Sequence, residues 1–208
     1  MVNVRTNIKE VTKDLNEVQK KQIPFATSRA INETGKLVLK GLAIEANKTF
    51  EGGATKQVLN AFKPRNKGDS ANINYSNKKT LRTIVFLPKW AAKFLRYQID
   101  GGIRRTKGKG TGVPTRNADL NQYGNIPGRR KGLIKRQNQM IATINGVEGV
   151  WEKNKRSGEL KLLIAFVKAP RYTKKFKYYS KANKIISAHI EKRMRLSLAD
   201  ALKNARKK

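Results

Sequence analysis

The sequence contains no cysteine and only one histidine, His189. Without cysteine the chain can form neither a disulfide nor a thiolate metal site, and it carries no signal of a redox compartment. The fold must therefore be held together by packing alone. With 208 residues, of which 38% are hydrophobic, the chain is long enough to bury the core of one ordinary domain and too short for several. We expect one compact domain.

Long apolar runs are also absent. No stretch approaches the roughly 18 uncharged apolar residues that indicate a membrane span. Residues 1–20 are charged and lack the apolar core of a signal peptide. We therefore expect a soluble protein of intracellular origin that has no membrane partner.

Acidic residues are scarce. The chain has 14 Asp and Glu against 47 Lys and Arg, which gives a formal net charge of +33. A charge this large should cause strong self-repulsion within a compact isolated monomer. An anionic partner or an assembly is therefore expected to compensate the charge. Nucleic acid is the first candidate, because a phosphate backbone releases condensed counterions when it binds cations. An acidic protein ring is the second, and a solvated basic surface without a specific partner is the third.

The sequence carries no catalytic pattern. His189 falls within an expected helix, with no carboxylate or nucleophile at a spacing typical of a catalytic site. The acids are scattered, so a two-metal site would need distant carboxylates to converge. They include Asp14, Glu45, Asp100, Asp119 and Glu191. We expect neither an enzyme nor a metal or cofactor site.

One glycine-rich segment superficially resembles a phosphate-binding loop. Gly102 and Gly108 are one residue too far apart for that motif, and Lys109 is followed by Gly110 rather than by Ser or Thr. The motif needs that hydroxyl for magnesium. Nucleotide binding is therefore not expected.

Hydrophobic periodicity predicts helices near both ends of the chain. Within the helix expected at 25–50, Gly35 and Gly41 indicate either close approach of another element or a kink. A short helical or irregular segment is expected at 55–65. The predicted helices cover residues 8–22, 25–50, 90–99 and about 180 to the C-terminus, with a further candidate at 133–141.

Alternating apolar residues predict strands at 72–87 and a hairpin formed by 149–152 and 160–167. Residues 103–123 have little periodicity and are expected to form a long exposed loop. These elements predict an α+β fold with long N-terminal helices, a small mostly antiparallel sheet and a long C-terminal helix that covers one face of it. The expected divisions are an N-terminal helical arm at 1–22, a central domain at 23–170 and a C-terminal segment at 171–208.

Two segments concentrate the cations. The first, between residues 103 and 136, contains ten cations and a single acid, Asp119. A flexible basic segment of this kind suits phosphate contact, although it can equally be a solvated loop. Its cations are Arg104, Arg105, Lys107, Lys109, Arg116, Arg129, Arg130, Lys131, Lys135 and Arg136.

The second basic segment interleaves cations with aromatic residues. Its cations are Arg171, Lys174, Lys175 and Lys177. Such a segment can stack on bases while it neutralises phosphates. The alternative is that Phe176 and Tyr179 simply anchor the start of the last helix in the core.

Three phrases together resemble a known family. The phrase at 24–34 contains Ala30 and Asn32, the phrase at 98–105 contains Gly101 and Gly102, and the phrase at 120–129 contains Tyr123, Gly124 and Asn125. In this order, across residues 20–140, they resemble the minor tail protein Z or tail-completion proteins of tailed phages and prophages. The sequence departs from the family where Glu51-Gly52-Gly53 follows Phe50, because family members often have a Pro-Thr-rich phrase there.

The resemblance implies a structural virion protein that acts at the end of tail assembly, in the tail or neck region, and influences how the DNA end is seated. It implies contacts with other tail or connector proteins, and it supplies no catalytic residues. We expect several copies per virion, made in the host bacterial cytoplasm, with the basic segments contacting either acidic neighbouring proteins or passing genomic DNA, the latter without reading its sequence. The alternative is a nonspecific nucleic-acid-binding protein that works free in the cytoplasm.

Overall fold

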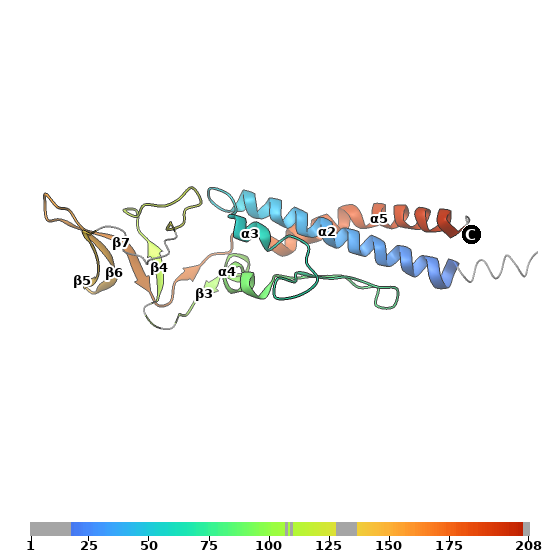
Figure 1. Cartoon of the computed structure of the whole chain (residues 1–208), viewed down its shortest axis with the longest axis horizontal. Coiled ribbons are helices and arrows are strands. Elements are labelled where there is room, and N and C mark those ends of the chain that lie inside the picture. The colour runs from blue at the N-terminus through green and yellow to red at the C-terminus, as the bar shows by residue number, and fades with distance from the viewer. Residues whose placement is uncertain (1–17, 107, 109, 128–136, 206–208) are drawn as a thin grey trace, which may run out of the picture. The chain divides into compact units, whose positions relative to one another are not determined.

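The computed structural model describes residues 18–106, 108, 110–127 and 137–205 (Figure 1). It has the expected α+β fold, with long helices near both ends and small antiparallel sheets. The chain forms two compact units instead of the single domain that we expected. The first unit contains 18–45, 56–93 and 177–205, and the second contains 46–55 and 94–176.

The first unit is built on two long antiparallel helices, residues 23–45 of α2 (Ile23–Thr49) and α5 (Tyr178–Ala205), which run side by side in Figure 1. Ion pairs Glu33–Arg193 and Glu45–Lys181 connect them at 3.5 and 3.4 Å. Both helices confirm the predictions for 25–50 and for the C-terminus. Of the helix expected at 8–22, residues 8–17 lie outside the described residues, and Val18–Gln22 form a π-helical turn, η1.

Gly41 explains how the two helices approach each other. A Cβ at this position would lie 2.1 Å from Cδ1 of Ile185, so any larger residue would force that side chain to move. The sequence left close approach and a kink open, and the structure supports close approach here. Gly35 similarly faces the strand pair β1 (Ile73–Asn74) and β2 (Ile84–Val85).

Hydrogen bonds attach this strand pair to α2. The Asn32 side chain donates to the Ser76 carbonyl at 3.0 Å and accepts from the Ser76 amide at 2.7 Å and the Thr83 hydroxyl at 2.6 Å. The short helix α3 (Lys56–Asn60) precedes β1. Buried Asn72 donates to the carbonyls of Ala61 and Lys63, so α3 and the strand pair are joined through satisfied polar groups.

The second unit contains a four-stranded antiparallel sheet in the order β4-β7-β6-β5. Val150, Leu163 and Ile164 form its buried cluster. The hairpin predicted at 149–152 and 160–167 is confirmed by β6 and β7. The strands are β4 (Thr111–Pro114), β5 (Gln139–Ile144), β6 (Val147–Lys153) and β7 (Leu160–Val167).

Strand β5 corrects the helix expected at 133–141. Residues 133–136 lie outside the described residues, but 139–144 form a strand paired with β6. The reason is the turn that follows: Asn145 and Gly146 both have positive φ, of 52° and 76°, and connect paired residues on the two strands. Asn-Gly is the preferred sequence for such a two-residue hairpin turn.

Two further expectations are wrong. Residues 103–123 are not a continuous loop, because they contribute to β3 (Gly102–Ile103) and contain β4. Among the described residues the strands form three separate sheets instead of one, and within its own unit α5 packs on α2. Strands β3 and β4 are short and pair with strands that are distant in sequence, so the local periodicity of residues 103–123 gives no signal of them.

Candidate nucleic-acid interface

The second unit brings the start of the first basic segment beside the second basic segment. Strand β3 pairs antiparallel with β8 (Arg171–Tyr172), with Gly102 opposite Tyr172 and Ile103 opposite Arg171. The pairing continues beyond the strands, because the Arg104 amide donates to the Pro170 carbonyl at 3.0 Å. We call residues 102–106 and 168–175 the basic ribbon.

The C-terminal end of helix α4 (Lys89–Asp100) positions this ribbon. This helix confirms the one predicted at 90–99, and Gly101 follows its last residue with a φ of +73° that suits glycine. The Gln98 carbonyl accepts from the amides of Lys175 and Phe176, both at 2.9 Å. A carbonyl that a helix end would leave unpaired thus holds the end of the ribbon.

Two tyrosines lie at the base of the ribbon. The rings of Tyr97 and Tyr172 are 5.5 Å apart at an angle of 32°. The guanidinium of Arg96 lies 4.7 Å from the Tyr97 ring centre and that of Arg104 lies 6.0 Å from it. Arginines over an aromatic face are attracted to it and lose side-chain freedom, so these cations are partly preorganised.

The charge of this region is strongly one-sided. Residues 94–106 and 168–176 contain seven cations and one acid, Asp100. All seven side chains are exposed or half-buried, so they can meet an external anion. They are Arg96, Arg104, Arg105, Lys168, Arg171, Lys174 and Lys175. The arrangement suits contact with a phosphate backbone and contains no element that would read bases in sequence.

Not every predicted contact residue belongs to this cluster. Arg116 is exposed just after β4, and exposed Lys177 belongs to the first unit. Seven others lie outside the described residues: Lys107, Lys109, Arg129, Arg130, Lys131, Lys135 and Arg136. Sequence reasoning missed Arg96, Tyr97 and Lys168. They join the cluster through pairing between segments distant in the chain, which no local pattern announces.

The anchoring alternative for the aromatic residues is correct for one of the two. Phe176 is buried, and its ring centre lies 5.7 Å from that of Phe50. Tyr179 is 64% exposed, so it does not anchor α5 in the core.

The phrases that carry the family resemblance have structural roles. Ala30 is fully buried in α2, and Asn32 holds the strand pair β1–β2 as described above. Residues 121–125 form a compact turn in which the Asn121 side chain accepts from the amides of Tyr123 and Asn125. Gly124 has a φ of +67° in this turn. These residues set the backbone path and do not form a binding cluster.

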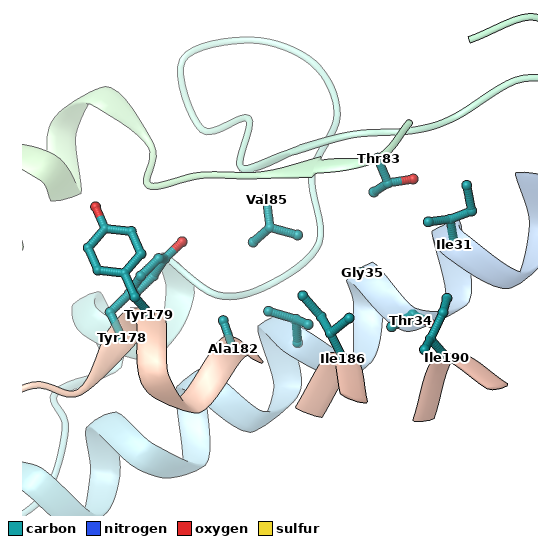
Figure 2. A pocket seen from close by; sticks show the side chains of 11 residues that line it. Ile31, Thr34, Gly35, Thr83, Val85, Tyr178, Tyr179, Ala182, Ile186 and Ile190 are labelled. Carbon is teal, nitrogen blue, oxygen red and sulfur yellow. The ribbon is translucent and has the colours of Figure 1, made fainter. Parts of the chain in front are cut away.

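The first unit contains an apolar groove of about 230 Å³ between α2, the strand pair and the start of α5. Figure 2 shows Thr83 and Val85 on the strand side and Ile186 and Ile190 on α5. The hydroxyl of Thr83 already donates to Asn32. Besides two threonines and two tyrosines, its lining is apolar, so the groove offers mainly apolar contact.

The described residues contain no group of three His, Asp or Glu side chains placed to hold a metal ion. In the same part of the chain, no helix is long and apolar enough to cross a membrane. No family model matches the chain, and searches of curated proteins and of solved structures give no significant match.

Proposed function

We propose that this chain is a structural component of a phage tail, of the minor tail or tail-completion type, located in the tail or neck near the path of the DNA. In this role it assembles with other tail or connector proteins and catalyses no reaction. The basic ribbon carries the proposal. It places cations from two segments about 70 residues apart in sequence on one pair of strands. Such an arrangement suits contact with a phosphate backbone without reading of base sequence.

The resemblance of residues 20–140 to the tail-completion family supports the location of this contact. A protein beside DNA that moves through a tail must hold any sequence equally, and electrostatic contact with the backbone does so. Multiple copies around the DNA would bring many such ribbons to one duplex, so each can bind weakly.

Salt-dependent binding to a short random-sequence duplex tests the role of the ribbon. The triple variant Arg105→Gln, Arg171→Gln and Lys174→Gln should lower the slope of log affinity against log salt by about 3, because each lost phosphate contact removes about 0.9. The matched control removes three exposed cations of the same unit at the β6–β7 turn, with Lys153→Gln, Lys155→Gln and Arg156→Gln. Equal losses in the two variants would show that the ribbon has no special role.

Particle composition tests the role in the virion. Mass spectrometry of gradient-purified particles of the encoding phage or prophage should detect the chain at several copies per particle. Deletion of its gene should leave tails that fail to complete or to join heads. A chain absent from particles would contradict the proposal.

The Tyr97–Tyr172 pair favours a second candidate, a nonspecific nucleic-acid-binding protein that works free in the cytoplasm. Aromatic faces beside cations are typical of proteins that bind single strands by stacking. This function requires the chain to be recovered from infected or induced cells on nucleic acid and outside particles, whereas the tail component requires the reverse.

A further inference from the structure

Strand β5 lies at one edge of the four-stranded sheet, and its composition differs from that of the rest of the chain. Residues 137–147 contain no Asp, Glu, Lys or Arg, and residues 137–152 contain no Lys or Arg. No other stretch of the sequence is free of charge, or of cations, for so long. In a chain of net charge +33, this segment can approach its own copy without bringing cations of the segment itself face to face.

The two edges of this sheet are unequal. Strand β4, at one edge, has four residues and ends at Pro114, which has no amide hydrogen to donate. Short length and proline are the devices that protect a sheet edge from pairing with another chain. Strand β5 has six residues, none of them charged or proline, and among the described residues it pairs only with β6. It therefore has none of these protections.

The side chains of β5 fit the same role. Met140 and Ile141 are 38% and 42% exposed, and Thr143 is exposed as well. Residues with apolar or β-branched side chains stabilise strand pairing when they meet similar side chains across it. A lysine or glutamate at these positions would oppose it, and the strand contains neither.

We infer that β5 is a self-association edge, which pairs antiparallel with β5 of a second copy and joins two four-stranded sheets across a twofold axis. The occupant is a second copy because the edge is neutral, and neutrality lets two copies of the same basic chain align their backbones. An acidic partner would find a better match elsewhere on the surface. A single strand pair buries less than the roughly 800 Å² per partner of a standard interface. Dimerisation should therefore be weak, with a dissociation constant in the micromolar range or above.

Sedimentation of the full-length, nucleic-acid-free protein tests this inference. We expect a monomer–dimer equilibrium that persists in about 1 M NaCl, where association through residual polyanions is screened. The variant Ile141→Lys should shift the dissociation constant upward by at least tenfold, because it places like charges across the pair. The matched control is Leu160→Lys, an equally exposed residue (39%) on the interior strand β7, which should leave the equilibrium unchanged.

The absence of cysteine allows a second test of the pairing geometry. Single cysteines introduced along β5 are each unique in the chain, and in an antiparallel dimer only the position near the twofold axis meets its own copy within disulfide reach. Mild oxidation should therefore give a cross-linking profile with one maximum along the strand, and Leu160→Cys should give none. The scan uses Met140→Cys, Ile141→Cys, Ala142→Cys and Thr143→Cys.

Three results would overturn the inference: a monomer at all concentrations, a dimer indifferent to Ile141→Lys, or a flat cross-linking profile. None of them bears on the basic ribbon, whose contact with DNA is measured separately. If instead the duplex-binding test fails while β5 pairs as expected, the proposed DNA contact is lost and the self-association edge stands.

Discussion

Gly41 sets how closely α2 and α5 approach each other. Its role can be tested together with Ile185, whose Cδ1 lies where a side chain at position 41 would begin. In the native chain, Gly41→Ala should destabilise the fold by about 1 kcal/mol. Overpacking costs roughly 1–3 kcal/mol, and the gain in helix propensity returns about 1 kcal/mol. The variant Ile185→Val removes Cδ1, the atom that the new Cβ would meet. In that background Gly41→Ala should become neutral or stabilising. Chemical denaturation of the native protein, the two single variants and the double variant measures this coupling. Additive effects would contradict the close contact.

Tyr178, at the start of α5, gives the fold a dependence on alkaline pH. Burial raises the pKa of its hydroxyl to about 12, with a further contribution from neighbouring Tyr179. The unfolded chain releases this proton near pH 10, so the contribution of Tyr178 to stability is complete below pH 10 and is lost as pH rises towards 12. The free energy of unfolding of the native protein should therefore fall more steeply over this range than that of Tyr178→Phe. Across this range the native protein should lose up to about 2 kcal/mol relative to Tyr178→Phe. Parallel curves would contradict the role of burial.

At the scale of elements, the long helices and the β6–β7 hairpin could be predicted because their signals are local. Apolar residues at Leu198 and Leu202 recur with helical spacing, and the strands of the hairpin flank a polar turn containing glycine. For the basic ribbon, the sequence shows the basic composition of the two segments but not that they pair. Its strands have two residues each, and Ile103 meets Arg171 through contacts far apart in sequence. The helix expected at 133–141 is wrong at 139–141, where β5 forms, because the Asn145-Gly146 turn outweighs weak helical spacing.

Gly101 joins α4 to the ribbon, and its substitution should release one from the other. A Cβ there would lie 3.1 Å from the Tyr172 carbonyl oxygen, and the positive φ adds strain of about 1–2 kcal/mol. Gly124 is a matched control, because its φ of +67° is similar and a Cβ would meet nothing within 4 Å. We expect Gly101→Ala to lose about 1 kcal/mol more than Gly124→Ala in urea denaturation and to weaken duplex binding. Equal losses would mean that the contact with Tyr172 does not hold the ribbon.

At the scale of the whole molecule, the charge of +33 and the apolar core have opposite effects on the stability of the folded chain. Buried apolar residues such as Leu39, Leu42 and Leu95 stabilise the folded chain. The cations repel each other most strongly when the chain is compact. A partner that supplies negative charge therefore acts on stability as well as on location. Under the two proposals made above, the basic ribbon meets an anionic partner and the neutral edge strand β5 meets a like-charged copy.

This balance predicts how salt and DNA act together on thermal stability. Raising NaCl from about 50 to about 500 mM shortens the Debye length severalfold, so the melting temperature of the free protein should rise as self-repulsion is screened. At the low salt concentration, a short duplex should raise it further, because a ligand that binds the folded state stabilises it by mass action. That second increase should vanish at the high salt concentration, where phosphate contacts weaken. The ribbon variant with Arg105, Arg171 and Lys174 changed to Gln should keep most of the response to salt and lose most of the response to DNA. If DNA stabilised this variant as strongly as the native chain, the negative charge would be acting on the molecule as a whole and the ribbon would not be its binding site.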